Sequence, residues 1–184
     1  MARRTPRAST RPERGAPALL WAPWRSAYVG KPPPRGAGCI FCFGRIGEAA
    51  RRRRLVLNAG RLALVMLNRY PYNNGHLMVA PRRHVASPEL LTREERIELG
   101  DFIARAVQRL RAAYRPAGLN VGANLGRAAG AGIADHMHWH LVPRWEGDNN
   151  FMPVIGSTRV LPQSLAETYA LLEPLFKTID TDLS

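Results

Sequence analysis

Cysteine is scarce in this chain, and no apolar run is long. Two cysteines among 184 residues are too few for a secreted disulfide framework, so we expect a reducing, cytoplasmic setting. The longest apolar stretch, Leu62–Leu67, is far shorter than the roughly 20 residues of a membrane-spanning helix. Residues 1–18 lack the apolar segment of a secretory signal. A hydrophobic content of 46% is nevertheless enough for the core of one domain.

Lysine is also rare, although the chain is strongly basic. The formal net charge is +13, and only Lys31 and Lys177 among the 27 basic residues are lysines. Much of the excess lies in residues 1–18 and in the run Arg51–Arg54. Such clusters attract polyanions, including nucleotides and nucleic acid. They are equally typical of a solvated basic surface, so we expect neither nucleic acid nor a membrane as a partner.

The composition divides the chain into three parts. Residues 1–18 are rich in Arg and Pro and poor in large apolar side chains, which predicts a disordered tail. Residues 19–38 join an aromatic segment to a Pro-rich linker. Its Trp21 and Trp24, like Trp145, are candidates for base stacking, an oligomer interface or ordinary packing. Residues 39–184 are predicted to form the compact domain with a C-terminal extension.

Within this domain, the pattern predicts an α+β fold. Thr92 and Glu95 have the spacing of a capping box, and apolar residues at helical spacing follow them. Ser164 and Glu167 indicate a second helix over Ser164–Ile179, which Pro174 should kink or shorten. Five short strands are predicted at Leu55–Leu57, Leu62–Leu67, His76–Ala80, Leu119–Ala123 and Met137–Val142, with Asn58-Ala59-Gly60 as a turn. Strands in a run with one long inserted helix favour an antiparallel sheet.

Three of the five histidines alternate along one predicted strand. His136, His138 and His140 should share one face of that strand, because successive side chains point to opposite faces. Three imidazoles on one face are difficult to explain by packing. They could ligate a metal, or they could form a nucleophile whose neighbours fix its tautomer.

A Gly-rich segment, Asn124–Gly132, enters the same strand. Its backbone N–H groups could approach phosphate oxygens closely. The alternative is a tight turn in which glycine adopts a positive φ. Next to three histidines, the segment indicates phosphate chemistry.

These motifs together resemble the histidine triad superfamily of nucleotide-binding proteins and hydrolases. Residues 136–142 match its pattern His-φ-His-φ-His-φ-φ, where φ is hydrophobic. Residues 73–84 resemble the family's Gly-His strand with the Pro, basic residues and His that follow it, and Asn124-Leu-Gly126 resembles its Asn-x-Gly element. The resemblance covers residues 39–145. The segments around LWAPWR and HMHWHLVPRWEGDNNFMPV look most like the bacterial branch described as diadenosine tetraphosphate phosphorylases or hydrolases.

The resemblance implies a fold and a two-step reaction. The fold is an antiparallel sheet of about five strands with one long helix and a C-terminal helix. His138 would attack the α-phosphorus of a dinucleoside polyphosphate, and phosphate or water would then release the nucleotidyl group. His140, His136 and His76 would complete the catalytic set. The implied substrate-binding residues are Asn68, Asn124, Gly126, Gly130 and Gly132.

The chain departs from many relatives between the Gly-rich turn and the histidines. Relatives often carry Gln-Ser or Gln-Thr there, whereas residues 131–134 read Ala-Gly-Ile-Ala. Alternative functions are therefore an adenosine phosphoramidase-type hydrolase and a nucleotide-binding regulatory module with little catalysis.

Several relatives carry a structural zinc ion, and the matching residues here are Cys39, Cys42, His84 and His136. The alternative is two free, buried cysteines that act as small hydrophobes. No organic cofactor is implied. Relatives usually form dimers across the long helix and an edge strand, so at least a homodimer is expected.

Overall fold

A computed structural model describes residues 38–148 and 162–177 of the chain. The expected tail, the aromatic arm with Trp21 and Trp24, and residues 178–179 of the C-terminal helix lie outside these ranges. The described residues form three α-helices, two short 3-10 helices and five strands. Their order is α2 Glu48–Arg54, β1 Val56–Ala59, β2 Ala63–Leu67, β3 Leu77–Pro81, η1 Pro88–Leu90, α3 Arg93–Tyr114, β4 Gly118–Ala123, η2 Arg127–Ala129, β5 Trp139–Arg144 and α5 Leu165–Lys177. None of these helices combines the length and apolar character needed to cross a membrane.

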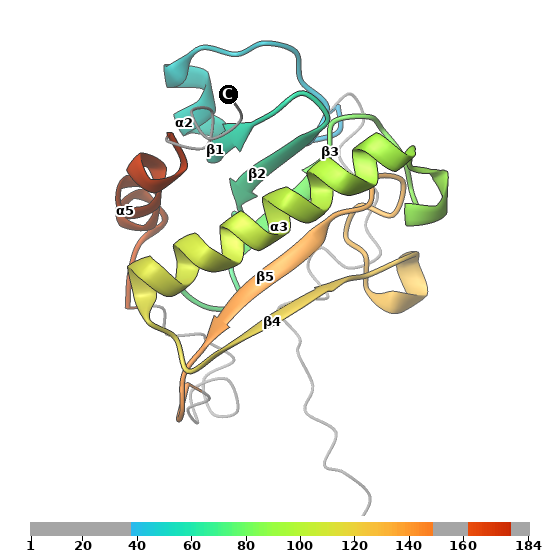
Figure 1. The fold of residues 1–184 in the computed structure, drawn as a ribbon. Helices are drawn as coiled ribbons and strands as arrows, with labels where there is room; N and C mark the ends of the chain where they lie inside the picture. The colour runs from blue at the N-terminus through green and yellow to red at the C-terminus, as the bar shows by residue number, and fades with distance from the viewer. Residues whose placement is uncertain (1–37, 149–161, 178–184) are drawn as a thin grey trace, which may run out of the picture.

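The five strands form one antiparallel sheet in the order β1-β2-β3-β5-β4. The predicted α+β fold is therefore confirmed. The long helix α3 lies diagonally across one face of the sheet, and α5 lies beside it near β1 (Figure 1). Strand β5 is central to the site because it pairs with both β3 and β4.

Side-chain alternation gives the sheet two different apolar faces. Val65 and Leu67 of β2 pack with α3 and α5 in the larger core, which includes Phe102, Leu110 and Leu172. Strand residues that point the other way pack around Phe41, in a smaller cluster with Val56, Leu64, Met66, Met78 and Ala80. The segment after Cys39 thus covers the face of the sheet opposite α3.

The predicted helix starts are confirmed at α3 and α5. The Thr92 hydroxyl accepts from the backbone N–H of Glu95, and the Glu95 carboxylate accepts in return from Thr92 N–H. Ser164 and Glu167 make the same reciprocal pair at α5. Pro174 lies inside α5 without ending it, because the helix continues to Lys177.

One local expectation is wrong, and one helix was not predicted. The run Arg51–Arg54 is the last part of a helix, α2, which escaped notice because it buries no residue and so has no apolar periodicity. The predicted turn at residues 58–60 begins later, since Asn58 and Ala59 belong to β1. Asn58 fits in a buried strand because its Nδ2 donates to the Phe176 carbonyl at 2.7 Å.

The β1–β2 turn needs glycine at position 60. A Cβ there would lie 2.6 Å from Glu98 Oε1 and 2.9 Å from Phe102 Cζ. Glu98 Oε1 also accepts from the backbone N–H groups of Leu62 and Ala63, at 2.7 and 3.0 Å. The turn is therefore fastened to α3 by close packing and two hydrogen bonds.

Candidate active site

The three alternating histidines lie together, but not within one strand as expected. Strand β5 begins at Trp139, so only His140 belongs to it. The chain before it leaves the sheet, where the Met137 N–H donates to the Val85 carbonyl at 2.7 Å. Alternation still holds, because Met137 packs in the α3 core. The rings of His136 and His138 lie on the other side, with centroids 5.0 and 4.9 Å from that of Phe41.

His138 is held in a single tautomer by its neighbour. Its Nδ1 lies 3.0 Å from the backbone carbonyl oxygen of His136. A carbonyl can only accept, so Nδ1 carries the proton and Nε2 keeps its lone pair. The side chain is buried, and burial lowers the pKa of His138, although the hydrogen bond to the His136 carbonyl raises it in part. This tautomer leaves the lone pair of His138 Nε2 free of a proton.

His76 and His140 form a second ordered pair. The Tyr72 N–H donates to His76 Nδ1 at 3.0 Å, which assigns the His76 proton to Nε2. That Nε2 lies 2.9 Å from His140 Nδ1 and donates to it. His140 consequently carries its own proton on Nε2. The ring centroids of His138 and His140 are 4.9 Å apart, so the N–H donor of His140 lies beside the His138 ring.

Asn68 supports this pair from the end of β2. Its Oδ1 accepts from the Tyr70 N–H at 2.9 Å, and its Nδ2 lies 3.5 Å from His76 Nε2. The latter contact is too long to compete with the bond between His76 and His140. The expected role of Asn68 in substrate binding stays a prediction, since the hydrogen bond to Tyr70 is that of a turn-forming asparagine.

The two cysteines lie against His84 and His136. Cys39 Sγ and Cys42 Sγ are 3.2 and 3.5 Å from His136 Nδ1, and Cys42 Sγ is 3.3 Å from His84 Nδ1. All four ligand atoms lie within 4.8 Å of one another. Burial raises the pKa of the Cys42 thiol, as does contact with Cys39.

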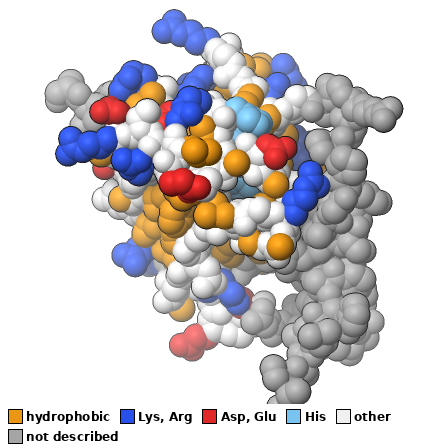
Figure 2. Space-filling view, turned by 90° about the vertical axis from the view of Figure 1, so that its right-hand side faces the viewer, with side chains coloured by type: hydrophobic (Ala, Val, Ile, Leu, Met, Phe, Trp, Pro, Cys, Tyr) orange, Lys and Arg blue, Asp and Glu red, His pale blue; other side chains and the backbone are white. Residues whose placement is uncertain are grey.

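This quartet has the geometry of a tetrahedral metal centre. Zn–S and Zn–N bonds of normal length place S and N atoms about 3.6 Å apart on a tetrahedron edge, close to the separations found here. His136 Nε2 donates to the Pro81 carbonyl at 2.8 Å, so the Nδ1 lone pair is available. His84 is exposed. Figure 2 shows that histidine side chains reach the surface on the face drawn there. The four residues could therefore hold a metal.

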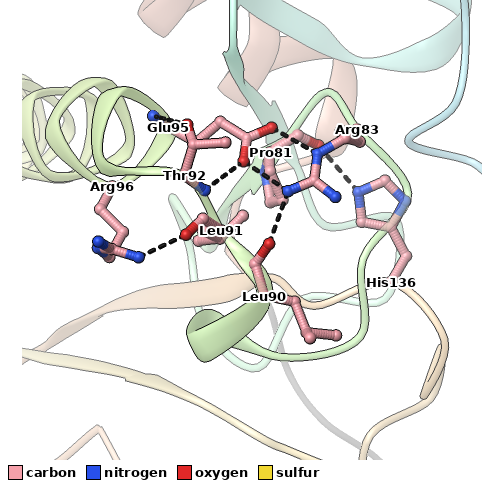
Figure 3. Close-up of polar contacts among 8 residues, drawn as sticks. All are labelled: Pro81, Arg83, Leu90, Leu91, Thr92, Glu95, Arg96 and His136. Atoms are coloured by element: carbon pink, nitrogen blue, oxygen red, sulfur yellow. Dashed lines mark hydrogen bonds and ion pairs between the residues drawn. The ribbon is translucent and has the colours of Figure 1, made fainter.

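An ion pair that sequence reasoning missed holds the segment that carries His84. Arg83 donates from Nε and Nη2 to the two oxygens of Glu95, at 2.8 and 2.7 Å, and from Nη2 to the Leu90 carbonyl at 2.7 Å. Glu95 is buried at the start of α3, and the Arg83 hydrogen bonds lower the pKa of its carboxyl. Figure 3 shows this pair between η1 and α3, next to the contact of His136 with Pro81.

A cavity of about 380 Å³ opens beside His140. Asn124 lines it, as its predicted substrate role requires, together with Tyr72 and Asn120. The wall is fixed by Asp148, which receives two hydrogen bonds from Arg144 at 2.6 and 2.7 Å and one from Asn73 at 2.9 Å. The hydrogen bonds from Arg144 lower the pKa of Asp148 most. The contact between Asn73 and Asp148 could not be predicted from the sequence, because the two residues are 75 positions apart and ordinary in type.

The glycines of the loop do not line this cavity. Gly126 and Gly130 have φ of 80° and 88°, on either side of the short η2 turn. Glycine adopts these angles without strain, so the turn interpretation accounts for both. Gly132 is exposed. Their contact with substrate stays a prediction.

Trp145 contacts the Tyr114 ring edge-on, with centroids 6.2 Å apart, as the packing alternative predicts.

Comparison with known proteins agrees with this arrangement. The HIT domain family matches residues 53–147, just over half of the chain. A protein named AP-4-A phosphorylase from Mycobacterium tuberculosis is 42% identical over 158 residues, which cover 83% of this chain and 81% of that protein.

Solved structures give the same fold. A Zn-bound histidine triad family protein from Mycobacterium smegmatis has a TM-score of 0.55 at 24% identity, covering 70% of this chain and 87% of that one. A hypothetical histidine triad nucleotide-binding protein from Sulfolobus tokodaii has a TM-score of 0.57 at 24% identity, covering 79% and 93%. Histidine geometry, sequence match and fold agree: this chain belongs to the HIT domain family.

Proposed function

We propose that this enzyme transfers a nucleotidyl group from a dinucleoside polyphosphate through a covalent intermediate on His138. The observation that carries the proposal is the 3.0 Å hydrogen bond between His138 Nδ1 and the His136 carbonyl. It leaves the Nε2 lone pair for attack, and it stabilises the positive ring that forms when Nε2 becomes bonded to phosphorus.

In the first step, His138 Nε2 attacks the α-phosphorus of the substrate. The N–P bond forms while the bond from phosphorus to the bridging oxygen breaks, and the leaving polyphosphate keeps the electron pair. From diadenosine tetraphosphate the leaving group is ATP, and adenylyl-histidine remains. In the second step, an oxygen of phosphate or water attacks phosphorus, and Nε2 recovers its electron pair. Phosphate yields ADP, and water yields AMP.

His140 and the Asn124 loop act on charge that develops at the phosphoryl group. The Nε2–H of His140 is a fixed donor, because His76 determines its tautomer through the 2.9 Å contact. Preorganised donors of this kind stabilise the transition state more than the ground state. Asn124 lines the adjoining cavity, where it would position phosphate oxygens or ribose. Gly126, Gly130 and Gly132 would let the backbone approach the substrate closely.

Inorganic phosphate is the acceptor that we propose. The mycobacterial protein with 42% identity is named a phosphorylase, which requires phosphate rather than water. Arg144 and Asn120 line the cavity beside His140 and are hydrogen-bonded to each other at 3.1 Å. The Asn120 amide is a suitable donor for an incoming phosphate, whereas Arg144 would contribute mainly by holding Asn120, because its guanidinium is already paired with Asp148.

We also infer that Cys39, Cys42, His84 and His136 hold a structural zinc ion. The support is the tetrahedral spacing of the four ligand atoms, the His136 tautomer, and the Zn-bound relative of the same fold. The ion would fix four protein ligands and so stabilise the fold rather than bind substrate. Its effect on the reaction is indirect, because His136 also orients His138.

Product analysis tests the reaction. Diadenosine tetraphosphate is incubated with the enzyme with and without inorganic phosphate. ADP plus ATP, formed only with phosphate, is the expected result; AMP plus ATP in both samples indicates water as the acceptor. Because the P–N bond of a nucleotidyl-histidine is labile in acid, the enzyme is denatured at alkaline pH after mixing with substrate in the absence of phosphate. It should then carry one nucleotidyl group by mass spectrometry, and His138→Ala should carry none. Wild-type turnover by a folded His138→Ala protein would overturn the assignment, as would absence of turnover in the wild type.

A further inference from the structure

We propose that this chain carries a second anion site, built from arginines, that binds an oligophosphate chain. The site is a cavity of about 600 Å³ on which Arg45, Arg51, Arg61 and Arg82 converge. None of its lining residues lines the His140 cavity. The proposal therefore does not depend on the reaction assigned to His138.

Three separate segments form the walls of this arginine cavity. Phe43–Ile46 follow the second cysteine, Ala59–Arg61 form the β1–β2 turn, and Arg51 projects from α2. Arg82 joins two of these walls, since its Nη2 donates to the Phe43 carbonyl at 3.0 Å and its Nη1 lies 3.5 Å from the Gly60 carbonyl. Segments from three parts of the chain thus bring guanidinium groups to one cavity.

The rim of the cavity is held in place before any ligand arrives. The β1–β2 turn is fastened to α3 through Glu98 and cannot accept a side chain at Gly60. The guanidinium of Arg82 also lies over the Phe43 ring, 5.7 Å from its centroid. A preorganised charged site loses little conformational entropy when a ligand binds.

The positive charge of the cavity is poorly compensated. No carboxylate lines it, and within residues 38–148 and 162–177 none of its four guanidinium groups forms an ion pair with Asp or Glu. Glu94 is an acidic residue that interacts with one of these arginines, Arg61, through its charge. Hydrogen bonds at the helix N-terminus lower the pKa of Glu94, and Arg61 lowers it further without a bonded contact. Four cations in one cavity repel one another until an anion is bound.

Arginine forks select the class of ligand. A guanidinium pairs with phosphate oxygens through two parallel hydrogen bonds, and several forks around one cavity suit several linked phosphates. A nucleobase has no evident stacking partner among the lining residues, because the Phe43 ring already contacts Arg54 and Arg82. The shared chemistry is therefore an oligophosphate chain, supplied either as an inorganic oligophosphate or as the phosphates of a nucleotide.

Calorimetric titration with inorganic tripolyphosphate tests the site in the full-length protein. The test variant is Arg45→Gln/Arg51→Gln, since the structure gives the two guanidinium groups no hydrogen bond that the change would break. The control variant is Arg93→Gln/Arg111→Gln, which removes the same charge from exposed positions of α3. Binding should weaken about 100-fold in the test variant, because each charge-assisted hydrogen bond is worth roughly tenfold or more. The control should bind like the wild type.

Further readouts separate this site from the His138 cavity. Amide NMR shifts on titration should cluster at residues 43–46 and 59–61, and turnover of diadenosine tetraphosphate should be unchanged in the test variant. A matching titration with ATP distinguishes the sources, because equal affinity indicates that a nucleotide is accepted and weaker affinity indicates an inorganic chain. The metal content of the protein is measured before and after each titration, so that removal of a bound metal by tripolyphosphate is not mistaken for binding of tripolyphosphate to the site. Equal affinity of test and control variants, or no binding by the wild type, would overturn the proposal.

Discussion

His136 contacts His138 through its backbone carbonyl and the cysteines through its imidazole ring. The His136 carbonyl oxygen lies 3.0 Å from His138 Nδ1, and the His136 Nδ1 lies 3.2 Å from Cys39 Sγ. One residue thus belongs both to the group that could hold a metal and to the support of the proposed nucleophile. Removing a residue of the cysteine–histidine cluster should therefore lower the stability of the fold directly. It should alter the orientation of His138 only indirectly, through His136.

Substitution of one residue of the cysteine–histidine cluster tests whether stability is affected more than activity. His84→Ala should abolish stoichiometric metal binding and lower the free energy of unfolding by about 3 kcal/mol, or roughly 10 °C in Tm. Residual activity should remain, because His84 makes no contact with His138. Elemental analysis and thermal unfolding are the measurements, with chelator-treated wild type as the control. Tag-free wild-type protein without bound metal would contradict the prediction.

His76 should affect turnover through His140 alone. In His76→Leu, His140 loses the partner that fixes its tautomer, so kcat should fall roughly 10- to 100-fold, less than the loss typical of removing a charge-stabilising donor itself. KM should change little. His76→Gln should recover part of the rate, since an amide can accept from Tyr72 N–H and donate to His140. Equal losses in the two variants would show that His76 acts by packing.

Glu95 should make the protein sensitive to acid. The Arg83 hydrogen bonds hold its folded-state pKa below the ordinary value of 4.5. Its contribution is complete above that ordinary value and is lost as pH falls through the lower folded-state pKa. Glu95→Gln should be less stable at pH 7 by about 2 kcal/mol, since it loses the ion pair with Arg83 and keeps only one of the two acceptor oxygens. The difference from wild type should shrink toward pH 3. Asp101→Asn, exposed on the same helix, is the control for urea denaturation at each pH, and a difference that does not vary with pH would contradict this account.

Two glycine substitutions should have opposite signs. Gly60→Ala forces a Cβ to within 3 Å of Glu98 and Phe102 and should destabilise the fold by about 2 kcal/mol. Gly100→Ala meets nothing within 4 Å inside α3, where alanine should stabilise by about 0.5–1 kcal/mol. Chemical denaturation of both variants measures the pair. A neutral Gly60→Ala would mean that the β1–β2 turn can move away from α3.

The edge strand β4 is where the expected homodimer should form. Within the part of the chain that the structure describes, it pairs with β5 alone, and its Val121 is 41% exposed. Val121→Lys should convert a dimer to a monomer, since a buried, unpaired charge opposes association. Leu171→Lys on α5 is the matched control, because Leu171 is also 41% exposed. Light scattering after size-exclusion chromatography gives the mass, and a wild-type monomer or an unaffected dimer would refute the prediction.

The features that could be predicted from the sequence are those that depend on residues close together in the chain. The Thr92–Glu95 capping box predicted the start of α3, and period-2 alternation placed Met137 in the core opposite the histidines. The short apolar runs marked all five strands to within about two residues. The resemblance brought Cys39, Cys42, His84 and His136 into one set, and the structure places their ligand atoms together.

Features that join residues far apart in the sequence could not be predicted in this way. Arg83 and Glu95 are ordinary surface types in sequence, and their pairing depends on how the chain after β3 returns to α3. Asp148 and Asn73 meet only because the ends of different strands lie side by side. The arginine cavity combines α2, a turn and the end of β3, and only one member of the run Arg51–Arg54 lines it. Tertiary packing determines all three.

The cysteine–histidine cluster also has a consequence for folding order. Cys39 and His136 are 97 residues apart, and β1, β2, β3, α3 and β4 all lie between them. Bringing such distant ligands together costs loop-closure entropy, which only the intervening sheet and helix can offset. A cation could therefore be captured at full coordination only late, after most of the strands have paired. Metal uptake followed in time should report the end of folding rather than its nucleation.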